Sequence, residues 1–244
     1  MQSNDQQAYD RGITIFSPDG RLYQVEYARE AVKRGSPTVG VRTDEAVVLT
    51  SLARTRSSLM EPDSIEKLHD VDGRIGIGSA GHVADARRLV DFARRYAQRE
   101  RLRYGEAPAV DPIATAVADH IQESTQTGGT RPFGAALLVA GVDPDSTTPR
   151  LYEVDPSGTP SEWQATAVGS GGAAIREFLE TEYESGLDVD TGVALALEAL
   201  AEGGDDEGLQ AAELDLAVLE ADGIDRFGSD RRTTALDDAG LSPS

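Results

Sequence analysis

The sequence contains no cysteine, which excludes disulfide bonds and thiolate metal sites. Aromatic residues make up only 5% of the 244 residues, so alanine, valine, leucine and isoleucine must build most of the core. No apolar run is long enough to cross a bilayer, and the first ten residues, MQSNDQQAYD, lack the apolar segment of a secretory signal. We therefore expect a cytoplasmic protein with a sizeable core, in one large domain or two small ones.

Basic residues are few, 23 against 43 acidic ones, which gives a formal net charge of −20. Such a surface repels nucleic-acid phosphates and anionic lipids, so we expect neither nucleic acid nor membrane as a partner. The acidic residues are spread along the chain, which favours solvation in a high-salt cytoplasm over the recruitment of a basic partner. Lysine is nearly absent: Lys33 and Lys67 are the only two, and a retained lysine is a candidate for a specific role.

The hydrophobic pattern predicts groups of strands that alternate with groups of helices. A Pro-Asp-Gly turn at 17–20 precedes a helix from about residue 20 to 34, with Asp19 as its N-cap and Gly35 at its end. Strands are expected at 38–51 (a hairpin), 65–68, 74–78, 133–141, 150–155, 163–169 and 213–220. Further helices are expected at 82–103, at 111–121 with Asp111 as its cap, at 173–183 and at 189–201.

This order of elements fits two antiparallel sheets packed face to face with helices outside. The predicted fold class is therefore α+β, a four-layer αββα sandwich with an extra N-terminal helix. We expect a polar tail over residues 1–12, one domain over 13–227, and a disordered polar C-terminal tail over 228–244.

Two glycine-rich motifs are compatible with nucleotide binding but lack its context. GIGSAG at 76–81 is followed by two helices rather than by the remainder of a βαβ unit, which favours a tight strand-to-helix turn. GSGG at 169–172 lacks the Lys-Ser/Thr of a P-loop. The three histidines (His69, His82 and His120) have no metal-ligand spacing, so we expect neither a cofactor nor a metal.

The stretch Gly35-Ser36-Pro37-Thr38 resembles the cleavage junction of N-terminal-nucleophile hydrolases, where self-cleavage frees a nucleophile whose own amine is the general base. With DEAVVL, EKLHDVDGRIGIGSAGHVADARRLV and AVGSGG it resembles the proteasome subunit superfamily over residues 1 to about 227. That resemblance implies the αββα sandwich of the N-terminal-nucleophile hydrolases. The segment YDRGITIFSPDGRLYQVEYA, residues 9–28, is similar to the N-terminal hallmark of α-type subunits, which catalytic β-type subunits lack.

The same resemblance locates the catalytic positions of β-type subunits. The nucleophile falls at Ser36, which is internal and followed by Pro37; the acid falls at Leu52, which cannot ionise; the lysine falls at Lys67. Two of the three groups are missing, which implies that the chain is not itself a peptidase and has no catalytic residue. A self-processed hydrolase with Ser36 as nucleophile and a scaffold protein that forms no barrel are the alternatives.

Resemblance to α-type subunits also implies partners. Seven α subunits form a ring on each face of the β-type rings, and unfolded protein substrates enter through the pore of the α ring. Residues 1 to about 12 are then the gate, with Tyr9, Asp10 and Arg11 at its base. The family's cluster that holds the tails open matches Tyr9, Asp10, Pro18 and Tyr27.

A hexameric AAA ATPase is the remaining partner implied by the resemblance. Its C-terminal tails dock in pockets between adjacent α subunits, lined by residues that match Pro18, Glu26, Gly35 and Lys67. Lys67 pairs with the incoming terminal carboxylate, a role suited to a compact ammonium. The sequence departs from the family at His82, where the pocket more often has an apolar residue, and this leaves the affinity at that edge open.

Overall fold

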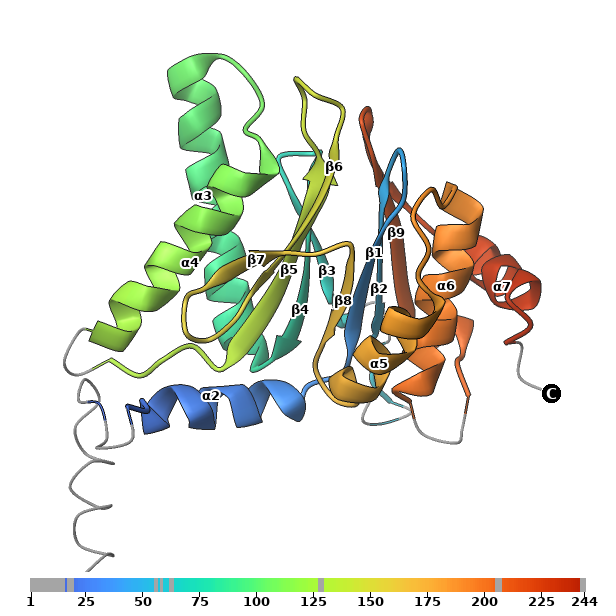
Figure 1. Cartoon of the computed structure of the whole chain (residues 1–244), viewed down its shortest axis with the longest axis horizontal. Helices are drawn as coiled ribbons and strands as arrows, with labels where there is room; N and C mark the ends of the chain where they lie inside the picture. Colours follow the sequence, from blue (N-terminus) through green and yellow to red (C-terminus); the bar gives the residue numbers. More distant parts are fainter. Residues whose placement is uncertain are drawn as a thin grey trace, which may run out of the picture.

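Two five-stranded antiparallel sheets, stacked face to face, form the middle of the molecule (Figure 1). The computed structural model describes residues 16, 20–54, 57, 59–61, 64–126, 130–204 and 208–241. Helices α3 and α4 cover the outer face of one sheet, and α5, α6 and α7 lie on the outer side of the other (Figure 1). This is the four-layer sandwich that the order of the elements predicted.

The first sheet has the strand order β10-β9-β2-β1-β8. Its central hairpin, predicted at 38–51, pairs β1 with β2 and places Gly40 opposite Leu49. Strand β9 pairs with the other edge of β2, and β10, which was not anticipated from the sequence, returns beside β9. The strands are β1 (Thr38–Arg42), β2 (Val47–Leu52), β8 (Ala165–Val168), β9 (Leu214–Glu220) and β10 (Gly223–Arg226).

The second sheet has the strand order β3-β4-β5-β6-β7. A tight turn joins β3 to β4, and two of its residues are left-handed, Asp72 with φ 66° and Gly73 with φ 75°. So tight a turn pairs the residues nearest to it, which is why β3 runs from 68 to 71 and not over the predicted 65–68. The strands are β3 (Leu68–Val71), β4 (Ile75–Gly81), β5 (Ala135–Val142), β6 (Pro149–Val154) and the short β7 (Pro160–Glu162).

Helices α3 (Val83–Tyr104) and α4 (Val110–Gln126) pack on the second sheet. Helix α3 ends as expected near residue 103, at a left-handed Gly105 with φ 77°. Helix α4 begins at Val110, one residue before the predicted cap. The reason is that the carboxylate of Asp143 accepts the N–H of Val110 at 3.0 Å, so a distant side chain takes the role that Asp111 was expected to have.

Most of the described C-terminal segment is helical, where the sequence predicted a disordered tail. Residues 228–244 were expected to be disordered, but Ser229–Asp238 form helix α7, which packs against α6. Although the helix is strongly polar, Leu236 is buried in the core shared with α6, and Phe227, Ala235 and Leu241 pack around the same cluster. A single apolar stripe thus holds a helix that its average composition did not predict.

Helices α5 (Gly172–Glu182) and α6 (Val189–Glu202) cover the first sheet. Asp188 caps α6 by accepting the N–H of Thr191 at 2.8 Å. A short 3₁₀ helix, Ala211–Glu213, then leads into β9.

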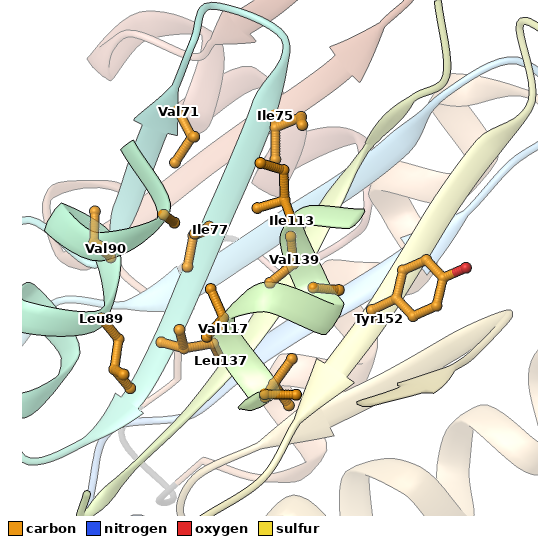
Figure 2. Packing of buried hydrophobic residues seen from close by; sticks show 14 of the residues in the cluster. Val71, Ile75, Ile77, Leu89, Val90, Ile113, Val117, Leu137, Val139 and Tyr152 are labelled. Carbon is orange, nitrogen blue, oxygen red and sulfur yellow. The ribbon is translucent and has the colours of Figure 1, made fainter. Parts of the chain in front are cut away.

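Small aliphatic side chains fill the core in three clusters, as the scarcity of aromatic residues predicted. One lies between α3, α4 and the second sheet: Figure 2 shows Val117 next to Leu137 and Ile113 next to Val139. The second lies between the first sheet and α5, α6 and α7. The third lies between the two sheets. The ends of this inter-sheet layer are not covered by the sheets themselves, so other elements must close them.

Helix α2 (Tyr23–Lys33) closes one of those ends, where it lies across the strands and packs on β4 and β5 (Figure 1). Its buried residues are Val25, Ala28 and Val32, on one face as predicted. The helix begins three residues later than expected, with Leu22 at the N-cap position and no side-chain cap bond there among the described residues. The predicted cap, Asp19, lies outside the described residues.

Candidate functional site

The segment between α2 and β1 is held on both sides by glycine backbone. A β-carbon on Gly35 would lie 2.1 Å from the nitrogen of Gly81, at the end of β4. On the other side, the carbonyl of Gly35 accepts the N–H of Ser170 at 2.8 Å. Gly169 (φ 105°) approaches Ser36 and Pro37 so closely that a β-carbon there would lie 2.8 Å from the Ser36 carbonyl oxygen. Ser36 therefore lies within the chain, in a segment whose backbone packs closely against β4 on one side and against Gly169 on the other.

The three positions that the resemblance assigns to catalytic groups lie at this end of the sandwich. Leu52 donates its N–H to the carbonyl of Pro37 at 3.1 Å, so it lies beside the junction. Its side chain is 2% exposed and belongs to the core under α5 and α6. An apolar core residue thus occupies the place where an ionisable acid would be needed. Of the three positions that the resemblance assigns, Lys67 is the one with an ionisable side chain of the expected type.

Lys67 is buried, with a residue exposure of 7%. Its carbonyl accepts the N–H of Ser79 at 3.2 Å, and its N–H donates to Asp215 Oδ2 at 3.0 Å. Within the described part of the chain, no hydrogen bond or ion pair engages the Nζ atom. Burial lowers the pKa of the Lys67 ammonium, and the charge of Asp215 opposes that shift. An ammonium that is largely removed from water and has no direct partner among the described residues is destabilising, and an incoming anion would relieve that cost.

Gly35 and Lys67 lie close to each other, as a shared site requires. Lys67 is bonded to Ser79 of β4, and Gly35 lies against Ala80 and Gly81 of the same strand. Glu26 lies about two turns back along α2, where it accepts Arg29 Nη1 at 2.8 Å. Within a single chain, two of the predicted docking residues, Gly35 and Lys67, thus lie against the same end of β4, and Glu26 lies on α2, the helix that leads to Gly35.

Arg29 also anchors α2 to the second sheet. Its Nε and Nη2 atoms both donate to Asp155 Oδ2, at 3.1 and 2.8 Å, just beyond the end of β6. Burial acts to raise the pKa of Asp155, but hydrogen bonds from Ser157 and Arg29 outweigh it and lower that pKa. Tyr27, elsewhere on α2, is 51% exposed. The helix thus keeps a fixed inner face and leaves Tyr27 exposed.

A second charged network lies beside the end of α2. Asp85 is 3% exposed. Its carboxylate accepts hydrogen bonds from both terminal nitrogens of Arg131, at 2.6 and 2.8 Å, and from the N–H of Gly134 at 2.9 Å. Burial acts to raise the pKa of Asp85, and these bonds outweigh it and lower that pKa. Gly134 lies near Ala31 of α2. His82 is exposed at the same corner, 3.9 Å from Asp85.

Four residues of the site were not predicted from the sequence: Asp85, Arg131, Asp155 and Asp215. Each acts on a residue that is far away in the chain, by 46 positions for Arg131 and Asp85 and by 148 for Asp215 and Lys67. No local spacing could have revealed them. The predicted gate residues Tyr9, Asp10, Arg11 and Pro18 lie outside the described residues.

Other kinds of site find little support. In the part of the chain that the structure describes, no group of acidic and histidine side chains is arranged to hold a metal ion. Among the same residues, no helix combines the length and apolarity needed to span a membrane. A hollow of about 400 Å³ opens between β9, β10 and α7. Glu66, Leu68 and Asp215 line it, but Lys67 does not.

Two family models match the chain in adjacent stretches. The model for proteasome subunits matches residues 32–219, and the model for the N-terminal signature of A-type proteasome subunits matches residues 9–31. The second match coincides with the segment that resembles α-type subunits in the sequence. Together the two matches extend from the predicted gate base to the last long strand.

Curated relatives from halophilic archaea are similar over most of their length. The proteasome alpha 2 chain of Haloarcula marismortui is 58% identical over 222 residues, which cover 91% of this chain and 90% of that protein. The proteasome alpha chain of Halobacterium salinarum is 59% identical over 219 residues, 90% of this chain and 85% of that protein. The proteasome alpha 1 chain of Haloferax volcanii is 58% identical over 222 residues, 91% of this chain and 86% of that protein.

Proposed function

The chain belongs to the proteasome subunit family as an α-type member, and from this premise we propose that it is a non-catalytic, ring-forming component that admits substrates and docks an ATPase. Seven copies, or copies mixed with a close relative, form a ring on each face of the β-type rings. Unfolded proteins pass through its pore to the enclosed active sites of the β-type subunits. A cytoplasmic location fits this role.

The observation that carries the docking proposal is the state of Lys67. The residue is almost fully removed from solvent, and within the described part of the chain its ammonium has no direct hydrogen bond or ion pair. Retaining a charge in such a place lowers stability unless a ligand uses it. A terminal carboxylate is a ligand of matching charge and size. The hexameric AAA ATPase that we propose as partner supplies one such carboxylate from each of its subunits.

The junction supports a non-catalytic role. Ser36 is internal to the chain, its backbone packs against Gly169, and the position that the resemblance assigns to the acid holds buried Leu52. An N-terminal-nucleophile hydrolase needs a free α-amine, an acid and a lysine together. Helix α2, which precedes Ser36, occupies the end of the sandwich. We therefore place the peptidase activity in the β-type partners.

The gate belongs to the residues before α2. In this proposal, residues 1–12 close the pore, Tyr9, Asp10 and Arg11 form its base, and Pro18 and Tyr27 contact a neighbouring copy in the ring. The exposed ring of Tyr27 supports that contact, because tyrosine offers an apolar face and a hydroxyl to a partner. Deleting residues 1–12 should raise the hydrolysis of small peptides by the assembled particle. Unchanged rates would contradict the gate.

The test of docking compares the only two lysines. Core particles that contain Lys67→Ala should lose ATPase-stimulated degradation of an unfolded protein, yet cleave small peptides at the basal rate. Lys33→Ala removes an exposed lysine paired with Glu30 and is the matched control, which should keep full stimulation. If Lys67→Ala particles are stimulated as well as Lys33→Ala particles, the docking role is wrong.

The alternative hydrolase makes an opposite prediction. If Ser36 were an active nucleophile, the mature chain would begin at Ser36, and Ser36→Ala would leave the chain uncut. We expect the intact mass of each protein to be that of its uncut chain, and equal peptidase activity of the particles that contain them.

A further inference from the structure

Asp215 lies where β9 enters the first sheet, facing the space between the two sheets. It is opposite Ser51 in the β2–β9 register. Alternation along β9 puts it on the same face as Ala217 and Leu219, which belong to the cluster between the sheets. Ser51 shares the corresponding face of β2, and its Oγ atom is buried without a hydrogen-bond partner in the described structure. The end of the inter-sheet layer beside Lys67 is therefore polar.

The carboxylate of Asp215 bridges the two sheets to reach Lys67. Its Oδ2 atom accepts the Lys67 N–H at 3.0 Å, although 148 residues separate the two. The carbonyl of Lys67 is held in turn by the N–H of Ser79 on β4 at 3.2 Å. Both polar backbone groups of Lys67 are thus fixed, one by each sheet, just before β3 begins.

Asp215 is also the acidic group whose charge acts on the ammonium. Strands β2 and β4, which pack beside β3, carry no titratable side chain in VVLTSL and IGIGSAG. The neighbouring Glu66 is directed to His69 at 3.4 Å and to Arg226 at 3.6 Å. From α3, Arg94 donates to the carbonyl of Asp70. Burial lowers the pKa of Lys67, and the charge of Asp215 counteracts this.

We propose that Asp215 is a positioning residue of the docking site: it fixes the backbone of Lys67 and places a negative charge beside the residue whose ammonium receives the incoming carboxylate. The proposal rests on the docking role of Lys67. It assigns two separable tasks to one side chain, a hydrogen bond to the Lys67 N–H and a negative charge near the ammonium.

Two substitutions separate these tasks. Asp215→Asn keeps an oxygen that can accept the Lys67 N–H but removes the charge. The pKa of Lys67 should then fall, by about one pH unit for the loss of one nearby opposite charge. Asp215→Glu keeps the charge on a longer side chain and should keep that pKa near the wild-type value. If Asp215 only supported the fold, the pKa of Lys67 would not differ between the two variants in this way.

The chain's composition makes a direct measurement practicable. With selectively ¹³C-labelled lysine, NMR should show two side-chain signals, one from Lys67 and one from exposed Lys33, which serves as internal reference. Asp215→Asn should shift the Lys67 titration to lower pH and leave that of Lys33 in place. Equal Lys67 titration in wild type and Asp215→Asn would overturn the proposal. If Asp215→Asn does not fold, the Asp215→Glu protein provides the test. A pKa of Lys67 in that protein that differs from the wild-type value by as much as about one pH unit also overturns the proposal.

Binding of a short peptide with the C-terminal sequence of the partner ATPase completes the test, with the same peptide amidated as control. Wild type should prefer the free carboxylate, and the Asn variant should lose this preference at lower alkaline pH than wild type. If wild type does not distinguish the two peptides, the docking function itself fails. If it does, and Asp215→Asn follows the wild-type pH profile, only the role of Asp215 fails.

Discussion

Replacing Gly35 with alanine tests how tightly the end of α2 is joined to the second sheet. The added β-carbon would lie 2.1 Å from the nitrogen and 2.7 Å from the α-carbon of Gly81, and 3.2 Å from the carbonyl carbon of Ala80. Carbon atoms in contact normally stay about 3.5 Å or more apart. All three opposing atoms are backbone, so no side-chain rotation can make room. Either α2 or the end of β4 must move by about 1 Å or more, a shift of the order of the overlap.

The cost follows from this geometry. Overpacking by one methyl group typically costs about 1–3 kcal/mol, and rigid neighbours put this site at the upper end, near about 3 kcal/mol. Gly134→Ala is a matched control at the same corner. Its β-carbon would meet Ala31 at 3.4 Å and Asp85 at 3.6 Å, which is ordinary contact. Its effect should stay below about 1 kcal/mol.

Urea unfolding followed by circular dichroism, at one fixed salt concentration, measures both changes in free energy. Hydrogen exchange at the amides of α2 shows whether the helix alone is released, in which case Gly35→Ala accelerates exchange in α2 more than elsewhere. Equal stability of the Gly35→Ala and Gly134→Ala proteins, with equal exchange in α2, would refute the close joint between α2 and β4.

Three further predictions concern other parts of the structure. Leu236→Ala should lower the free energy of unfolding by about 2–3 kcal/mol because it empties a buried site under α7, and no change in urea unfolding would mean that α7 is not docked. Arg29→Ala should cost about 1 kcal/mol and speed amide exchange in α2, since it removes two bonds to Asp155, whereas Lys33→Ala should cost less than about 0.5 kcal/mol; equal effects would refute the anchor. Burial lowers the pKa of His69, so the unfolded chain binds a proton at this residue at higher pH than the folded protein does, and stability falls as the pH drops below about 6.5. Between about pH 7 and 5, His69→Gln should therefore lose less stability than wild type in urea unfolding. Identical losses in the two proteins would contradict this.

Periodicity was sufficient to predict the fold because most elements carry their own signal. Strand β5 is buried along its whole length and was visible as an apolar run. Helix α3 shows an alanine and valine stripe and stops at a glycine. Two of the errors occurred where a distant contact decided the outcome. Asp143 sets the start of α4, and Leu236, one apolar residue in a polar helix, docks α7 on α6.

The candidate site divides in the same way. Resemblance to a family pointed to Gly35 and Lys67, and the structure brings both to one end of β4. It could not show that Lys67 is buried, because burial depends on how the two sheets are stacked. Asp215 is one of 43 acidic residues and has no distinguishing neighbours in the chain. Only the β2–β9 register places it opposite Ser51 and within reach of the Lys67 N–H.

We propose that this chain lies in the outer, non-catalytic ring of a proteolytic particle, and a measurement of mass tests this directly. Native mass spectrometry after co-expression with the β-type partner of the same cell gives the mass of the particle and then that of each released chain. We expect a particle with seven α-type chains in each outer ring, in which this chain is uncut before Ser36. A chain that begins at Ser36, or one that stays monomeric beside assembled β-type chains, would show that it does not have this place.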